Sequence, residues 1–343
     1  MAVYTTIDNP ELYFQTKIYT GDGNDDRDIV FDVTDTSLQP NMLWSARRDS
    51  GDNISIYDSV RGDGKELRSS SSSVELDRSD NIQALNSNGF QVGTDGQVNA
   101  SGGTYVSWAW KESATAGFDI VGYTGNKTDD VDISHSLSAV PHVIIVKNRE
   151  NVNNEHWGVY HHKNTSAPET DYLYLSSTAA TTDHDEFWSD EAPTSSVFTI
   201  GRQDVVNGSS EDHIAYLWTA KQGYSKFGSY VGNGASDTNG QFIFLGFRPA
   251  MVLVKRTNGT KDWKIFDNKR NGYNGSNEVL EPNNSDAEDT TEFLDFLSNG
   301  FRWIIPSSDA KYADVNGDGD TFIYMAFAEA PLVNSKGVPC NAR

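Results

Sequence analysis

The 343-residue sequence contains a single cysteine, Cys340, close to its C-terminal residue. One thiol cannot form an intrachain disulfide or a thiolate metal cluster, so neither organises the fold, which fits assembly in the cytosol. Positive charge is also scarce, because 27 Lys and Arg face 49 Asp and Glu and give a formal net charge of -22. A surface this acidic cannot neutralise phosphates, and we therefore expect no nucleic-acid partner.

Long apolar runs are absent too. No stretch approaches the roughly 20 apolar residues that a membrane-spanning helix needs, so we expect no membrane insertion. The first ten residues have neither the charged region nor the apolar region of a signal peptide. We therefore expect the protein to be made in the cytoplasm of the cell and, if it acts outside that cell, to leave by a route other than secretion.

Catalytic signatures are missing as well. The sequence has no G-x-S-x-G elbow, no P-loop and no dinucleotide-binding fingerprint. Carboxylates are so abundant that sequence cannot single out a glycosidase pair. We therefore predict no catalytic residues.

The chain does contain an internal repeat of roughly 105 residues, which is the size of one small sandwich domain. Three kinds of signal recur in the same order: a turn after an aromatic residue, a proline before an apolar strand, and an aromatic closing strand. The turns are Tyr19-Thr-Gly-Asp-Gly23, Tyr123-Thr-Gly-Asn126 and Tyr230-Val-Gly-Asn-Gly234, the prolines are Pro40, Pro141 and Pro249, and the closing strands are Tyr105 to Trp110, His213 to Trp218 and Phe322 to Phe327.

The repeat predicts an all-β fold of three tandem β-sandwich modules, lectin-like or jelly-roll-like, at 15–112, 117–220 and 224–330. Alternation of apolar and polar residues at Ile29-Val-Phe-Asp-Val33 is typical of a half-buried strand, and Asn88-Gly89 and Asn299-Gly300 are strong turn signals. Short junctions indicate that the modules pack on one another. One helix is expected, at 289–297.

Both ends of the chain lie outside the repeat. Residues 1–14 form a lead that either docks as a strand on the first module or serves as an attachment arm to a larger assembly. Residues 331–343 form a polar C-terminal tail.

Acid–base pairs recur in two modules at one spacing, as Asp58 with Arg61 and Asp267 with Arg270. Because no nucleophile accompanies them, we interpret them as structural ion pairs at a strand end. The second module has Asn164 in place of the arginine. It also carries four histidines that could in principle bind zinc, although exposed or hydrogen-bonded histidines are the simpler interpretation; they are His156, His161, His162 and His184.

Two ligand sites are candidates. Asp314, Asn316, Asp318 and Asp320 match the first half of a calcium loop, but Met325 stands where the bidentate glutamate belongs, and an Asx-rich turn is the alternative. Trp188 lies in an acidic loop that the other modules lack. With Tyr172 and Tyr174 it could contact a sugar or a receptor surface, or it could pack locally within its loop.

The repeated segments resemble a known family. Phe247-Arg-Pro-Ala-Met-Val-Leu-Val-Lys-Arg256, Ile323-Tyr-Met-Ala-Phe-Ala-Glu329 and Tyr57-Asp-Ser-Val-Arg-Gly62 are similar to a module of tail-fibre-like and other virion structural proteins of marine bacteriophages, including cyanophages. The resemblance covers nearly the whole chain and is weakest in the second module. It implies a non-enzymatic component of the virion, often associated with host attachment, which would leave the cell when the host lyses.

The resulting expectation is a bacteriophage virion structural protein, a tail-associated fibre, knob or adaptor that contacts a host glycan or receptor. Other virion proteins would be its partners, and a homo-oligomer such as a trimer is expected by analogy with tail fibres. The alternatives are a capsid or tail decoration protein without a receptor role, and a polysaccharide depolymerase.

Overall fold

The computed structural model describes residues 4–32, 36–150, 155–235, 239–270, 278–290, 294–305 and 311–340. The predicted all-β sandwich class is confirmed, since antiparallel sheets dominate and helices are limited to single turns. These turns are η1 (Pro10–Leu12), α1 (Gly96–Asn99), η2 (Pro168–Thr170), α2 (Asp185–Trp188), α3 (Asp204–Asn207) and α4 (Tyr312–Val315). No helix in this part of the chain has the length and apolar character that a membrane crossing requires.

Three large sheets share one strand order within the described residues. The orders are β1-β9-β3-β4-β5-β6, β10-β17-β12-β13-β14-β15 and β18-β24-β20-β21, where the bridges Ile265–Leu280 and Val279–Asp289 continue the third sheet. The strands are β1 (Phe14–Thr20), β3 (Met42–Arg47), β4 (Ser55–Asp58), β5 (Lys65–Arg68), β6 (Leu76–Asp77), β9 (Thr104–Trp110), β10 (Phe118–Thr124), β12 (Val143–Asn148), β13 (Gly158–His161), β14 (Asp171–Tyr174), β15 (Thr182–Asp183), β17 (Asp212–Trp218), β18 (Ser225–Val231), β20 (Phe247–Arg256), β21 (Lys264–Asp267) and β24 (Thr321–Pro331). We call β1–β9, β10–β17 and β18–β24 the first, second and third units.

A small sheet lies against each large one, in the orders β2-β8-β7, β11-β16 and β19-β23-β22. Its strands are β2 (Arg27–Val30), β7 (Ile82–Asn86), β8 (Gly89–Val92), β11 (Val131–Ser134), β16 (Val197–Ile200), β19 (Phe242–Phe244), β22 (Leu294–Leu297) and β23 (Gly300–Trp303). Asn88-Gly89 and Asn299-Gly300 form the turns of the β7–β8 and β22–β23 hairpins, as predicted.

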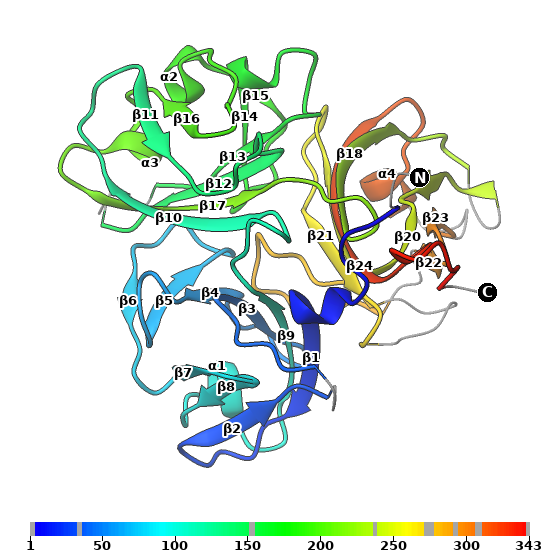
Figure 1. Cartoon of the computed structure of the whole chain (residues 1–343). Helices are drawn as coiled ribbons and strands as arrows, with labels where there is room; N and C mark the ends of the chain where they lie inside the picture. Colours follow the sequence, from blue (N-terminus) through cyan, green and yellow to red (C-terminus); the bar gives the residue numbers. More distant parts are fainter. Residues whose placement is uncertain are drawn as a thin grey trace.

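Each large sheet buries both of its faces, because alternate residues of a strand point to opposite sides. One face packs on the small sheet of its own unit, and three separate hydrophobic clusters fill these sandwiches. The other face joins a single central cluster that all three units build. Its equivalent positions on β9, β17 and β24 are Val106, Trp108, Trp110, Ile214, Tyr216, Trp218, Ile323, Met325 and Phe327. Figure 1 shows the units as three lobes around this centre.

A stacked ring pair explains the repeated aromatic residue at the opening turn. Tyr19 stacks on Tyr105 and Tyr123 stacks on His213, with ring centroids 5.0 and 5.1 Å apart. In the third unit the pair is Tyr230 with Phe322, at 4.9 Å. Each pair ties the first strand of a sheet to its closing strand, which is why an aromatic residue recurs at both positions.

The predicted helix at 289–297 is wrong in the residues that the structure describes, since Asp289 forms a β-bridge with Val279. Leu294–Leu297 form β22, which pairs with Gly300–Trp303 through the Asn299-Gly300 turn. Residues 291–293 lie outside the described part of the chain. Apolar spacing at Leu294, Phe296 and Leu297 fits either structure, and the hairpin partner decides for the strand.

The N-terminal lead packs mainly on the third unit, and not as a strand on the first. The Tyr4 hydroxyl donates to Gly246 O at 2.5 Å, and Ile7 is buried in the central cluster. Ser335 N–H donates to Asp8 Oδ1 at 2.6 Å, so the two ends of the described chain lie together. Phe14, the last residue of the predicted lead, already belongs to β1.

Candidate functional site

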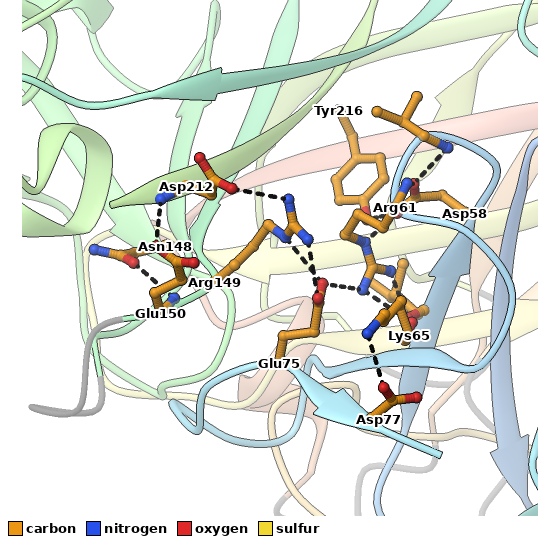
Figure 2. A network of polar contacts seen from close by, with 12 residues as sticks. Asp58, Arg61, Lys65, Glu75, Asp77, Asn148, Arg149, Glu150, Asp212 and Tyr216 are labelled. Atoms are coloured by element: carbon orange, nitrogen blue, oxygen red, sulfur yellow. Dashed lines mark hydrogen bonds and ion pairs between the residues drawn. The ribbon is translucent and has the colours of Figure 1, made fainter. Parts of the chain in front are cut away.

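A chain of charged and polar contacts joins the first and second units (Figure 2). Arg149 of the second unit binds Glu75 of the first through two hydrogen bonds of 2.9 Å. Glu75 also contacts Arg61 at 3.1 Å, and Arg61 pairs with Asp58. The Tyr216 hydroxyl of the second unit donates to Asp58 Oδ2 at 2.6 Å. The contacts therefore begin and end in the second unit and run through the first.

The third and first units repeat this arrangement at equivalent positions. Arg48 of the first unit donates to both carboxylate oxygens of Glu288, at 3.0 and 2.8 Å. Glu288 contacts Arg270 at 3.1 Å, and Arg270 donates to Asp267 at 2.6 Å. Trp108 Nε1–H of the first unit donates to Asp267 Oδ2 at 3.0 Å. The interpretation of Asp58–Arg61 and Asp267–Arg270 as structural ion pairs is thereby confirmed.

The boundary between the second and third units has a neutral version of the same chain. Thr181 N–H donates to Thr257 O at 2.8 Å, and the Thr181 hydroxyl donates to Asn164 Oδ1 at 2.6 Å. His161 takes the place of the aspartate, and its Nε2 lies 3.2 Å from the carbonyl of Tyr324. Met325 stands at the position of Tyr216 and Trp108. Its thioether cannot donate a hydrogen bond to His161 at the end of β13.

Burial sets the protonation of the histidines at this boundary. Desolvation lowers the pKa of His161 to about 3 and that of His142 to about 4. The Nδ1 atom of His161 accepts from Lys163 N–H at 3.1 Å, and that of His142 accepts from Ala220 N–H at 3.0 Å. Both rings are therefore held neutral by contacts that a second ring proton would break.

Two equivalent lysines cross the boundaries to backbone carbonyls. Lys147 Nζ donates to Ser72 O of the first unit at 3.3 Å, and Lys255 Nζ donates to Thr178 O of the second at 3.1 Å. Burial lowers the pKa of each to about 8. Both ammonium groups are buried, and their hydrogen bonds link neighbouring units.

A buried asparagine that the sequence analysis missed clamps the opening turn of every unit. Asn99, Asn207 and Asn316 each follow a valine near the end of a short helix, and all three are fully buried. Their side-chain amides donate to carbonyls of the opening turn, at 2.7 Å for Asn24 O, 2.7 Å for Thr128 O and 2.8 Å for Ala235 O. The signal that could have revealed it is the repeated Val-Asn pair, whose asparagine lies six residues before Tyr105, His213 and Phe322.

The structure does not support the predicted calcium site at 314–320. Asn316 is the clamp just described, Asp318 is exposed, and the two remaining carboxylates are paired with cations. Asp314 lies 2.6 Å from Lys261 Nζ, and Asp320 lies 2.6 Å from Arg256 Nη2. Among the described residues no group of three His, Cys, Asp or Glu side chains is arranged to hold a metal, at this loop or at the histidines of the second unit.

Trp188 lies in the core of the second unit, which agrees with the alternative of local packing and not with contact to a sugar or receptor. It is 2% exposed, and its Nε1–H donates to Asp171 O at 3.2 Å. Ser189 and Asp190 both adopt left-handed conformations, so the chain reverses after α2 and the helix buries its aromatic residues. Tyr172 and Tyr174 are half-buried beside it, and Tyr172 stacks on Phe187 at 3.8 Å. Ligand contact by these two tyrosines stays a prediction.

The outer faces of the small sheets differ from unit to unit. In the first unit a shallow hollow is lined by Asp28, Asn86 and Gln91, and the Asp28 carboxylate accepts from Asn86 Nδ2 at 2.9 Å. In the second unit Asp132 accepts from the Thr199 hydroxyl at 3.0 Å. The units therefore share their core chemistry but present different groups to solvent.

Residues 9–331 match the model of the family described as a domain of unknown function (DUF7483), and the chain belongs to that family. The match spans all three units as one domain, which agrees with their common central core. No curated protein and no solved structure matches the chain.

Proposed function

We propose that this protein is a non-enzymatic structural protein of a bacteriophage particle, a tail-associated knob or adaptor that contacts the host surface. The resemblance of the repeated segments to tail-fibre-like and virion proteins of marine phages supplies the particle assignment. The observation that carries the proposal is the central hydrophobic cluster shared by three units, since it makes one rigid body with three outward faces.

The distribution of charged groups supports a scaffold. The buried acid–base pairs are Asp58–Arg61 and Asp267–Arg270, and both lie at boundaries between units. Arg61 is linked across the boundary to Arg149 by the shared carboxylate of Glu75, and Asp267 accepts a hydrogen bond from Trp108 of the neighbouring unit. Buried charges of this kind hold a fixed geometry, which a particle component needs when it presents binding faces.

Binding by such a body would be weak for each face and strong for the particle. Several copies on one particle convert successive contacts into intramolecular events, so modest affinities multiply. One chain already arranges three similar units around a common core. Assembly of several chains, as a trimer or another homo-oligomer, belongs to the same proposal.

Localisation on purified particles tests the proposal. Antibodies against the recombinant protein should label the tail region of the phage in electron micrographs, and purified protein should bind host cells saturably. Label spread over the capsid without cell binding would favour a decoration protein. Loss of host polysaccharide on incubation with the protein would favour a depolymerase, and absence of the chain from purified particles would refute the proposal.

A further inference from the structure

The edge strand β19 of the third unit exposes two phenylalanines. Phe242 is 41% exposed and Phe244 is 51% exposed, and no other phenylalanine or tryptophan in the described residues is comparably open. They stand two positions apart with buried Ile243 between them, so both rings lie on the outer face of the small sheet. At about 3.3 Å of rise per residue the two side chains start about 6.6 Å apart.

The other units have no aromatic residue at these positions. Ile29, Ile133 and Ile243 are equivalent, since they pair with Phe90, Phe198 and Phe301 on the neighbouring strand. The positions of Phe242 and Phe244 therefore correspond to Asp28 and Val30 in the first unit, and to Asp132 and Ser134 in the second. An exposed aromatic edge promotes aggregation, so core packing does not explain why the third unit alone carries it.

A lysine accompanies the two rings. Lys226 Nζ lies 5.4 Å from the ring centroid of Phe244 and donates to its carbonyl oxygen at 2.6 Å. Within the described residues Lys226 forms no ion pair with a carboxylate, in a protein of net charge -22. Pairing of β18 and β10 with their closing strands makes Lys226 equivalent to Asp119, and Gln15 takes this position in the first unit.

On the opposing strand Arg302 is the direct partner of Phe242, and it is ion-paired with Asp295 at 2.8 Å. The face thus combines two exposed rings with one cation that lacks an anionic partner and a second that is already neutralised. Its local charge is opposite in sign to that of the whole protein, so an anionic ligand would be attracted here and repelled elsewhere.

We propose that Phe242, Phe244 and Lys226 form a binding platform for an acidic polysaccharide. The C–H faces of successive sugar rings would pack on the two phenyl rings, and a carboxylate of the sugar would pair with the Lys226 ammonium. This inference rests on the proposed host-surface role and names the site and the ligand class for it. A hydrophobic segment of a partner protein would use the rings but would gain nothing from the cation.

Binding to immobilised polygalacturonate, with dextran as the uncharged comparison, tests the platform. The wild-type protein should bind polygalacturonate saturably and dextran at least about tenfold more weakly, because dextran offers no carboxylate to Lys226. The variant F242D/F244S places the residues of the second unit in the third and should weaken binding at least about tenfold. K226Q should weaken binding to polygalacturonate and leave dextran binding unchanged.

Two matched variants control for folding and for the face itself. F242Y/F244Y keeps aromatic rings and should retain binding, and V30S changes the equivalent exposed position of the first unit and should have no effect. Failure of the wild-type protein to bind polygalacturonate, or equal binding by F242D/F244S, would overturn the platform. A dimer in sedimentation that F242D/F244S dissociates would also overturn it, since the face would then cover a second copy. Labelling of particles tests the proposed function separately, whatever these variants show.

Discussion

Asp58 is the most informative single position for the role of the buried charges. The side chains of Asp58 and Arg61 are both 0% exposed, and Asp58 Oδ1 also accepts from the backbone N–H groups of Val60 and Arg61. In Asp58→Asn the side-chain oxygen can still accept these two bonds, so the turn is kept. The charge partner of the buried guanidinium is lost.

The expected cost follows from that loss. Breaking a buried ion pair by removing one partner costs about 3–5 kcal/mol. Glu75 stays 3.1 Å from Arg61 Nη1 and compensates in part, so we expect the free energy of unfolding to fall by about 3 kcal/mol. The double variant D58H/R61N copies the neutral pair of the second unit, His161 and Asn164. It should be less destabilised than Asp58→Asn alone, because no charge is left buried without a partner.

Urea unfolding followed by tryptophan fluorescence measures these changes. The matched control is Asp77→Asn, which breaks the pair between Lys65 and Asp77 in the same region (Figure 2). That pair spans 2.9 Å, but its side chains are 36% and 74% exposed, so its loss should cost at most about 1 kcal/mol. An Asp58→Asn variant no less stable than Asp77→Asn would refute the reasoning, and so would a D58H/R61N variant less stable than Asp58→Asn.

Three further predictions concern other positions. Burial lowers the pKa of His161 from 6.5 to about 3 and that of His142 to about 4, so the unfolded chain binds more protons than the folded one below pH 6.5. The free energy of unfolding should therefore fall as the pH drops from about 6.5 toward 4, by up to about 1.4 kcal/mol per pH unit for each histidine. His161→Gln should flatten this pH dependence in urea unfolding, and an unchanged slope would contradict the prediction. Asn207→Ala should lower the free energy of unfolding by about 2–3 kcal/mol, because the carbonyls of Thr128 and Gly201 lose their donor. Amide hydrogen exchange should become faster in the opening turn of the second unit, and protection equal to wild type would argue against the clamp. Trp188→Ala should lower the free energy of unfolding by about 3–5 kcal/mol as a core cavity, and a stable variant that only loses ligand binding would restore the surface interpretation.

Local patterns in the sequence were enough for the closing strands, the hairpin turns and the two acid–base pairs. The strand expected at Ile29–Val33 overlaps β2 only at Ile29 and Val30. Asn88-Gly89 lies at its hairpin turn, and Asp58 and Arg61 lie three residues apart, so both signals are local in sequence. The helix expected at 289–297 failed because its apolar spacing is ambiguous without the pairing strand Gly300–Trp303.

The relations between units could not be predicted because they depend on how the sheets pack. The equivalence of Glu75, Thr181 and Glu288 becomes visible only through their backbone bonds to the next unit, to Arg149, Thr257 and Arg48 respectively. The choice between the two interpretations of Trp188 is of the same kind, since Ser189 and Asp190 adopt left-handed conformations after α2 and Trp188 lies in the core. In both cases a backbone geometry absent from the residue pattern decides the outcome.

The adjacency of Asp8 and Ser335 has a mechanical consequence. Tension applied through both ends of the described chain would first peel the lead from the third unit and then pull the first and third units apart. That boundary carries the charged contacts of Arg48, Glu288 and Arg270 and would be loaded directly. The uncharged boundary at His161 and Thr181 would be loaded only through the second unit. Attachment of the protein by both ends would therefore load the charged boundary between the first and third units before the uncharged one.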